Sequence, residues 1–354
     1  MTTLNATSHR KATRGNNKES QMDLLSTKLY KKVLIDPMLH DKTLDRLFVV
    51  SGYSAAGMGI KHASDMMKLR AECSVPKINL MCGMTAEGGI GKEVHAGFVD
   101  LCTKTKLGFA CRYLVRGEPV HAKVYIWCAG NKPLLAYTGS ANYSQNAFRS
   151  ANTRREVLTQ CSPEMAYAFY NSLLADSADC CDNNAVKAVV GKSGVWKPNP
   201  QHDIGVAKVV KDPASRWNGL LSLKASLLME GSRIIHERGG LNWGQRGKRE
   251  RNQAYIPLNA KARKSDFFPA RGDYFTVTTD DGKVFQCVRA QADGKAIETY
   301  GSNSQLGRYF RQRLGLVDGA FVKAADLRRY GRTNVTFYKI DEENFVMDFS
   351  KPDK

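Results

Sequence analysis

Residues 120–144, VHAKVYIWCAGNKPLLAYTGSANYS, decide the fold expected for the first half of this chain. The apolar runs at 120–127 and 134–138 predict two buried strands. Side chains alternate between the two faces of a strand, so His121 and Lys123 are expected to point the same way. The second strand leads into a small turn that brings Ser140 and Asn142 close behind it.

Upstream, apolar runs alternate with helical patterns. Strands are expected at 46–51 (RLFVVS) and 77–81 (KINLM), each followed by a Gly-rich turn and a helix. The turns are GYSAAGMG at 52–59 and EGGIGK at 87–92, and the second lacks the spacing and hydroxyl of a nucleotide-binding P-loop. This order predicts an α/β/α layered domain with a mostly parallel sheet. Downstream, Ser162-Pro163-Glu164 predicts the start of a helix.

The pattern changes in the second half. Short β-rich runs recur at 254–258, 274–279, 283–290, 320–327 and 334–340, with turn signals between them. They predict a mainly β barrel or sandwich with one or two short helices. We therefore expect a disordered tail at 1–28, an α/β domain at 29–175, a polar linker at 176–215 and a β domain at 216–354.

Composition restricts the possible partners. The formal net charge is +19 and both halves of the chain are basic, which favours a polyanion such as nucleic acid. Neither a secretory signal nor a membrane-spanning run is present, so we expect a cytoplasmic protein. The nine cysteines form no CxxC pair, and Cys180 and Cys181 are adjacent. We expect them to be small buried apolar residues, not zinc ligands.

The residue types in the opening stretch suit phosphoryl chemistry. An imidazole such as His121 can attack phosphorus and form a covalent phosphohistidine. Lysine and asparagine beside it, here Lys123 and Asn142, can bind the phosphoryl oxygens. Two other HxK copies, starting at His9 and His40, lie outside apolar runs and have no GSxN behind them.

His121, Lys123, Ser140 and Asn142 together resemble the HxK…GSxN half-site of the phospholipase D superfamily. Glu156 matches the acidic residue that often follows this loop in single-motif nucleases, and the resemblance implies that it orients or tunes the histidine. The resemblance implies that one histidine attacks while a second protonates the leaving oxygen, without a metal or other cofactor. Cys128 stands where fuller motifs have aspartate, so the match is to the shorter, nuclease-type motif. Since no second motif exists here, we expect a homodimer with two copies of His121 in one site.

Two basic, amide-rich loops in the second half suit base reading in duplex DNA. Arg, Gln and Asn can read base edges, whereas Lys mostly contacts phosphate. The first loop offers Trp243, Gln245, Arg246, Lys248, Arg249, Arg251 and Asn252. The second offers Ser302, Asn303, Ser304, Gln305, Arg308 and Arg311, with the two arginines expected on one face of a short helix.

The segments GLNWGQR, NQAYIPL, FFPARGDYFTVTTDDG, SNSQLGRYFRQRLG, DLRRYGR and KIDEENFVMDFS resemble the DNA-binding domain of NgoFVII-type restriction endonucleases. That family joins a phospholipase-D-like nuclease to a seven-stranded pseudobarrel of the plant B-three type, and BfiI is a more distant relative. The resemblance implies a sequence-specific restriction endonuclease acting on double-stranded DNA. It also implies a cognate DNA methyltransferase and, in some relatives, a separate ATP-dependent partner protein.

Two other functions stay open. A phospholipase D-type lipid phosphodiesterase would want two motifs or a membrane-binding face, and no amphipathic basic helix of that kind is evident. A DNA-binding protein with an inactive phosphodiesterase fold would bind DNA in a salt-sensitive manner without cutting it.

Overall fold

The first half of the chain builds an eight-stranded sheet with the order β1-β7-β6-β5-β2-β3-β4-β8. The computed structural model describes residues 23–70, 74–104, 108–148, 155–191, 207–211 and 215–351. The strands are β1 (Leu24–Leu25), β2 (Arg46–Ser51), β3 (Lys77–Cys82), β4 (Phe109–Leu114), β5 (Lys123–Ala129), β6 (Lys132–Gly139), β7 (Leu158–Cys161) and β8 (Ser177–Asp179). Only β2–β3 and β3–β4 are parallel pairs. The expected mostly parallel sheet is therefore wrong, because β5, β6 and β7 follow one another as antiparallel neighbours.

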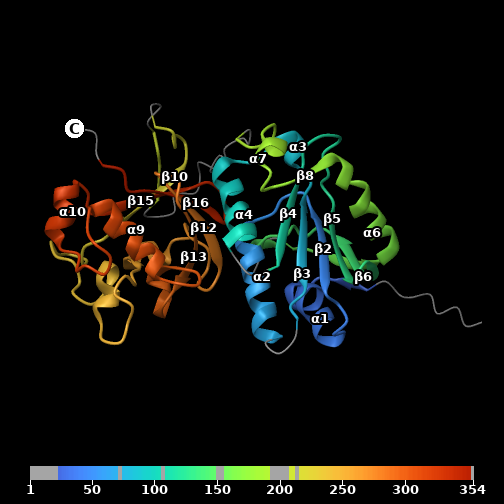
Figure 1. Cartoon of the computed structure of the whole chain (residues 1–354), viewed down its shortest axis with the longest axis horizontal. Coiled ribbons are helices and arrows are strands. Elements are labelled where there is room, and N and C mark those ends of the chain that lie inside the picture. The colour runs from blue at the N-terminus through green and yellow to red at the C-terminus, as the bar shows by residue number, and fades with distance from the viewer. Residues whose placement is uncertain are drawn as a thin grey trace, which may run out of the picture.

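Helices cover both faces of this sheet. Leu47 and Val49 of β2 point into one apolar core, and Phe48 and Val50 point into the other. The first core is closed by α2 (Ala56–Leu69) and α4 (Lys92–Lys104), and the second by α6 (Pro163–Ser172) (Figure 1). Ser162 caps α6 as predicted, because its Oγ accepts a hydrogen bond from the Met165 amide at 3.2 Å. Within the described part of the chain, no helix is long and apolar enough to cross a membrane.

The remaining helices of this half are short. They are the π-helix η1 (Tyr30–Ile35), the α-helices α1 (Asp36–His40), α3 (Thr85–Gly88), α5 (Gln145–Phe148) and α7 (Asn183–Val186), and the 3₁₀ helix η2 (Leu174–Asp176). Residues 177–191, which the sequence assigned to the linker, pack with the first sheet. β8 pairs with β4, and Val190 forms a bridge with Ile90. Most of the expected tail, residues 1–22, and residues 192–206 of the expected linker lie outside the described residues.

The second half builds another eight-stranded sheet, with the order β11-β14-β13-β12-β16-β15-β10-β9. Its strands are β9 (Lys208–Val209), β10 (Leu221–Ser226), β11 (Ile256–Pro257), β12 (Tyr274–Thr279), β13 (Val284–Ala290), β14 (Ala296–Thr299), β15 (Asn334–Lys339) and β16 (Asn344–Asp348). β10 packs against β11, but no strand pairing joins them among the described residues, so the sheet is open. The closed pseudobarrel is thus not confirmed.

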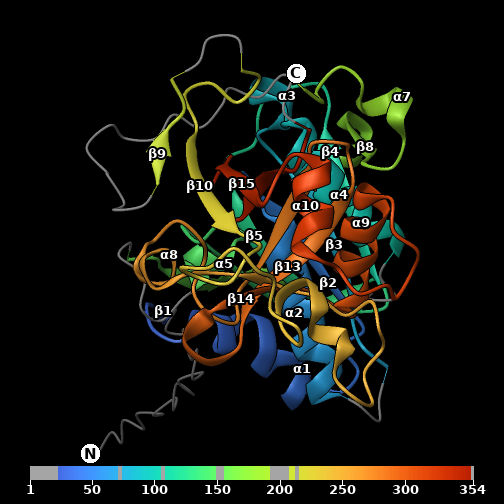
Figure 2. The ribbon, with the colours of Figure 1, turned by 90° about the vertical axis from the view of Figure 1, so that its left-hand side faces the viewer.

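Three helices accompany the second sheet: α8 (Ala260–Lys264), α9 (Ser304–Leu314) and α10 (Ala324–Tyr330). The helices α9 and α10 lie together on the outer side of the domain (Figure 2). The run at 320–327 was expected to be β-rich, but α10 begins within it. Asp326 explains this, because its carboxylate accepts a hydrogen bond from the Lys323 amide at 2.8 Å and caps the helix.

The two domains meet where α2 and α4 pack against β12 and β16 (Figure 1). A buried carboxylate, Glu343, accepts hydrogen bonds from the backbone amide and the side-chain amide of Gln145, both at 2.7 Å. The same glutamine side chain donates to the Tyr274 carbonyl at 2.6 Å and accepts from the Tyr274 amide at 3.0 Å. Burial raises the pKa of Glu343 to about 8. Because Gln145 opens α5, this contact joins the second domain to the loop that contains Asn142.

Glycines in α2 allow this close approach. The sequence placed residues 52–59 in a turn, but α2 already begins at Ala56. A Cβ on Gly57 would lie 2.4 Å from the Tyr274 carbonyl oxygen of the second domain. A Cβ on Gly59 would lie 2.6 Å from the side chain of Leu101 in α4. The glycines therefore serve packing between elements and not the bending of a turn.

We expect Gly57→Ala to lower the free energy of unfolding by about 1–3 kcal/mol, because the added methyl group meets backbone that cannot move alone. Gly88→Ala is the matched control, since a Cβ there meets nothing within 4 Å. Urea unfolding monitored by circular dichroism measures both variants. Equal stability of the two variants would contradict close packing at Gly57.

Candidate active site and nucleic-acid interface

The predicted catalytic residues gather at one edge of the first sheet. Ser51, the last residue of β2, pairs in register with Lys123, the first residue of β5. The end of β6 at Gly139 pairs with the start of β7 at Leu158. Strand ends that meet at one edge bring together His121, Lys123, Ser140, Asn142 and Glu156, which come from three separate segments.

His121 and Lys123 are in direct contact. The Lys123 Nζ lies 3.1 Å from Nδ1 and 3.3 Å from Nε2 of the His121 ring, and it donates to the His121 carbonyl at 2.7 Å. The strand predicted from residue 120 begins at Lys123, so His121 precedes it and is exposed. Lys123 is buried, and this burial lowers the pKa of its ammonium group, while the nearby charge of Glu156 opposes the shift.

The surroundings of the His121 ring come from the turn after β2. The Tyr53 ring meets it edge-on, with 5.6 Å between the ring centroids. A Cβ on Gly52 would lie 3.0 Å from His121 Cδ2, so the small residue leaves room for the imidazole. Sequence reasoning identified this Gly-rich turn but did not assign it to the site.

Ser51 positions the Asn142 loop, and sequence reasoning did not predict it. Its hydroxyl accepts a hydrogen bond from the Tyr143 amide at 2.9 Å and donates to the Tyr53 carbonyl at 2.6 Å. It also lies 3.4 Å from Asn142 Oδ1, which accepts a hydrogen bond from the Tyr53 amide at 3.3 Å. These contacts fix the Asn142 side chain with its carbonyl end held by the protein, so its NH₂ end is the one available as a donor.

Ser140 and Glu156 form a pair of their own. The Ser140 hydroxyl donates to the Glu156 carboxylate and accepts a hydrogen bond from the Val157 amide at 3.0 Å. Gly139 permits this approach, because a Cβ there would lie 2.2 Å from the Val157 carbonyl oxygen. The sequence suggested that Glu156 orients the histidine. In the described residues its hydrogen bond goes to Ser140, and it reaches Lys123 only through its charge.

The two predicted DNA-reading loops are neighbours, and Glu250 connects them. Its carboxylate accepts hydrogen bonds from the amide and side chain of Asn252, both at 2.9 Å, and from the Ser304 hydroxyl. The Arg308 guanidinium lies 3.4 Å from the same carboxylate. Glu250 was not among the predicted residues, because an acidic side chain in a basic loop gives no sign of binding DNA.

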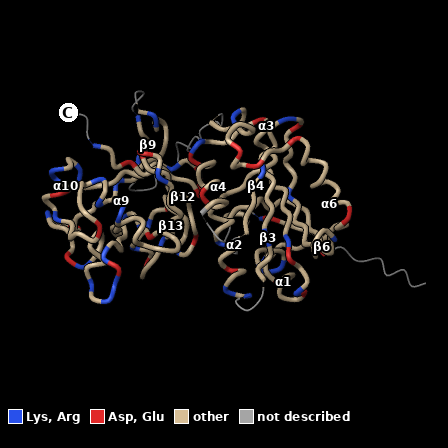
Figure 3. The backbone as a smooth tube through the Cα atoms, viewed as in Figure 1, with Lys and Arg blue, Asp and Glu red and all other residues tan. Residues whose placement is uncertain are grey.

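The predicted DNA-reading residues fall into exposed, half-buried and buried groups. The exposed group presents its side chains to solvent and consists of Arg246, Lys248, Arg249, Arg251, Ser302, Gln305 and Arg308. Within it, the Arg249 guanidinium stacks on the Trp243 ring at 4.2 Å. The basic residues of the first loop are visible as blue segments at the lower edge of the second domain (Figure 3). Trp243, Gln245 and Asn303 are half-buried.

Asn252, Ser304 and Arg311 are buried, which corrects their expected placement on a DNA-facing surface. The Arg311 guanidinium donates to the carbonyls of Ala320, Gly307, Leu241 and Arg251 at 2.8–3.3 Å. Asn252 Oδ1 accepts a hydrogen bond from the Gly319 amide at 2.7 Å. These side chains therefore hold the loops against α9, and only their exposed neighbours present side chains to solvent.

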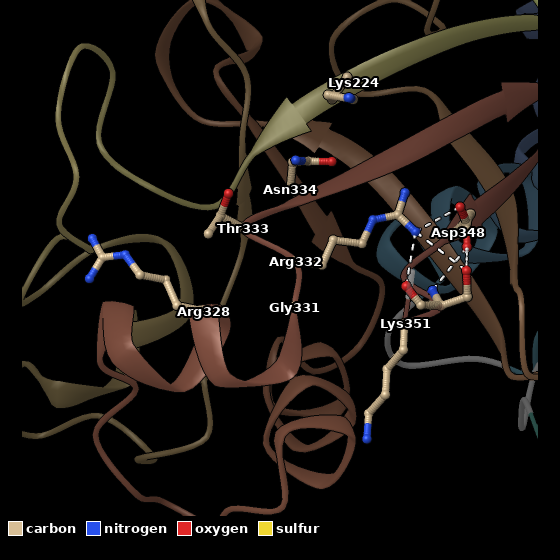
Figure 4. Close-up of a pocket in the computed structure, with 9 residues that line it drawn as sticks. Lys224, Arg328, Gly331, Arg332, Thr333, Asn334, Asp348 and Lys351 are labelled. Carbon is tan, nitrogen blue, oxygen red and sulfur yellow. Dashed lines mark hydrogen bonds and ion pairs between the residues drawn. The ribbon is translucent and has the colours of Figure 1, made fainter. Parts of the chain in front are cut away.

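A basic hollow between α10, β10 and the end of β16 was not predicted. Lys224, Arg328 and Lys351 line it, but their charged ends point to different sides (Figure 4). Arg332 is held by Asp348 at 2.7 Å. The cations of this hollow do not converge on one anion, so we assign it no binding role.

Fold and site thus define a phosphodiesterase-type domain of the phospholipase D kind joined to a basic, DNA-binding-type β domain. A model described as the NgoFVII restriction endonuclease N-terminal PLD domain matches residues 27–188. A second, the NgoFVII C-terminal B3-like DNA-binding domain, matches residues 218–341. The chain belongs to the NgoFVII restriction endonuclease family, which confirms the resemblance found in the sequence.

Other comparisons add little. No curated protein matches the chain. Among solved structures, the polyphosphate kinase of Porphyromonas gingivalis is similar over 44% of this chain and 23% of that one. The identity is 10% and the TM-score is 0.29, too low to support an argument about function.

Variants of Arg311, which is buried, and Arg308, which is exposed, test the separation of the predicted DNA-reading residues by burial. We expect Arg311→Ala to lower the free energy of unfolding by about 3 kcal/mol, because it leaves several buried carbonyls without a donor. We expect Arg308→Ala to change stability by less than about 0.5 kcal/mol and to weaken DNA binding. Urea unfolding and salt-dependent binding to duplex DNA measure the two effects. A stable Arg311→Ala variant with weakened DNA binding would place Arg311 on the reading surface instead.

Proposed function

We propose that this restriction endonuclease cuts DNA without a metal, through a covalent phosphohistidine on His121. The observation that carries the proposal is the contact between exposed His121 and buried Lys123 beside Asn142 at one sheet edge. A histidine nucleophile supplies what a metal-bound hydroxide supplies in other phosphodiesterases. The resemblance to the phospholipase D half-site supports the same chemistry.

In the first step, a ring nitrogen of His121 attacks phosphorus and the bond from phosphorus to the leaving oxygen breaks. The leaving oxygen takes a proton from His121 of a second subunit. In the second step, water attacks phosphorus and gives a proton to that second histidine, and the phosphorus–nitrogen bond breaks. Lys123 and the NH₂ group of Asn142 stabilise the charge that develops on the phosphoryl oxygens. Ser140, held by Glu156, assists from the adjoining turn.

Sequence specificity is assigned to the exposed residues of the two DNA-reading loops. Arginine and glutamine side chains such as Arg246 and Gln305 can make paired hydrogen bonds to base edges in the major groove. Lys248 and its basic neighbours would contact phosphate, which fixes the position of the domain on the duplex. Membership of the family also supports a cognate methyltransferase and a separate ATP-dependent partner as components of the same system.

We expect wild-type protein to cut plasmid DNA into discrete fragments in excess EDTA, and His121→Ala to lose about ten-thousand-fold or more of that activity. His40→Ala is the matched control. It removes the histidine of another HxK copy, which is exposed at the end of α1 and far from the GSxN loop in sequence. Undiminished cutting by His121→Ala would rule out the histidine nucleophile. If wild type binds DNA but does not cut, even when the ATP-dependent partner is supplied, the fold is inactive.

The shared dimeric site predicts how mixed subunits behave. Each chain supplies one HxK…GSxN set, so a heterodimer of wild type and His121→Ala lacks one of its two histidines. When equal amounts of the two proteins reassociate at random, one quarter of the dimers are wild type. We therefore expect about one quarter of the activity shown by the same total amount of wild-type protein. A mixture with His40→Ala should keep full activity. Half activity in the first mixture would mean that each subunit acts alone.

A further inference from the structure

A cluster of cysteines lies on the opposite side of the first sheet from β6 and β7, and the proposed reaction does not use it. Its sulfurs come from α4, β3, β4 and the turn that follows β8. Cys102 and Cys180 have their Sγ atoms 3.8 Å apart, and so have Cys180 and Cys181. On the buried side, the Cys180 amide donates to the Cys111 carbonyl, and the Cys111 Sγ lies 3.8 Å from that of Cys82.

The spacing of three of these sulfurs fits a metal. The Sγ atoms of Cys102, Cys180 and Cys181 all lie within 4.8 Å of one another. Zinc binds thiolates at about 2.3 Å, so two sulfurs of a tetrahedral site lie about 3.8 Å apart. The Cys102–Cys180 and Cys180–Cys181 contacts have this separation. Ordinary apolar packing does not require three thiols from segments 78 residues apart to meet at one point.

Burial around the cluster also suits a structural site. Cys180 is buried, Cys102 is half-buried and Cys181 is exposed, so an ion could enter from the side of Cys181. The adjacent residues are well fixed. The Cys180 amide donates to the Cys111 carbonyl at 3.0 Å, and the Cys181 amide donates to Asp179 Oδ1 at 2.8 Å. The turn is thereby held in place before any metal binds.

We propose that Cys102, Cys180 and Cys181 bind a zinc ion, with Cys111, whose carbonyl binds the Cys180 amide, as the candidate fourth ligand. The ion would join α4 to the segment that carries β8 and α7. That segment closes the edge of the first sheet through a strand of three residues. A short edge strand gains stability from a crosslink of this kind, and the role is structural because the cluster contains none of the residues assigned to cutting.

The first test is the metal content of the full-length protein purified under reducing conditions without chelator. We expect about one zinc per chain in wild type, and less than about a tenth of that in Cys102→Ser and Cys181→Ser. Cys161→Ser is the matched control, because it removes a half-buried thiol of β7 outside the cluster and should keep its zinc. Circular dichroism checks that each variant is folded.

A second measurement does not depend on the variants. Wild-type protein exchanged into Co²⁺ should show thiolate-to-metal charge-transfer absorption, and a strong chelator should lower its thermal unfolding midpoint. Protein that holds no zinc and gives no such absorption with Co²⁺ would overturn the proposal. A disulfide between Cys102 and Cys180 in the freshly isolated, unreduced protein would also overturn it.

The zinc site and the histidine chemistry can fail separately. Cutting in EDTA at a temperature where the chelated protein is still folded tests His121 alone. Loss of cutting that parallels loss of folded structure reports on the zinc site, whereas loss of cutting in fully folded protein reports on the reaction.

Discussion

The central strands of the first domain are buried on both faces, and the position of the active site depends on this constraint. Residues 47–51 of β2 and 123–128 of β5 are all buried. Polar side chains can therefore be accommodated only where these strands end, and Ser51 and Lys123 lie at such ends. Each meets hydrogen-bonding partners there, which offsets the cost of burying a hydroxyl and an ammonium group. The proposed catalytic residues thus collect at one sheet edge because the rest of the strand length excludes them.

A second constraint is the buried carboxylate at the boundary between the domains. The Glu343 carboxylate is buried at their boundary, and the hydrogen bonds from Gln145 offset part of the cost of its burial. Its pKa of about 8 in the folded protein exceeds the ordinary value of 4.5. The folded state therefore binds a proton more tightly than the unfolded chain. The contribution of this group to stability is complete below about pH 4.5 and is lost as the pH rises through about 8.

The sequence predicted the local features well. The HxK and GSxN segments, the helix capped by Ser162 and several strands of the second domain were all visible in it, because periodicity and capping act over a few residues. Strand pairing was not visible, since the antiparallel contacts of β5, β6 and β7 arise from connections whose direction the apolar pattern does not encode. For a related reason the cysteines were expected to be small buried apolar residues and not zinc ligands, since Cys102 and Cys180 meet only through the fold. Arg311 is different, because it lies between Phe310 and Leu314 on the apolar face of α9, and closer attention to that helical period would have indicated its burial.

The boundary between the domains has a consequence for protein engineering. Restriction enzymes with separate cutting and reading domains invite the exchange of one reading domain for another. Here the exchange would have to carry both halves of the contact, because Gly57 and Gln145 belong to the cutting domain while Tyr274 and Glu343 belong to the reading domain. A foreign domain without a carboxylate at the position of Glu343 would leave the Gln145 backbone amide without its acceptor, three residues from Asn142. The junction of a chimera should therefore not separate these four residues. A new second domain needs its own counterparts of Tyr274 and Glu343, matched to Gly57 and Gln145 of the first domain.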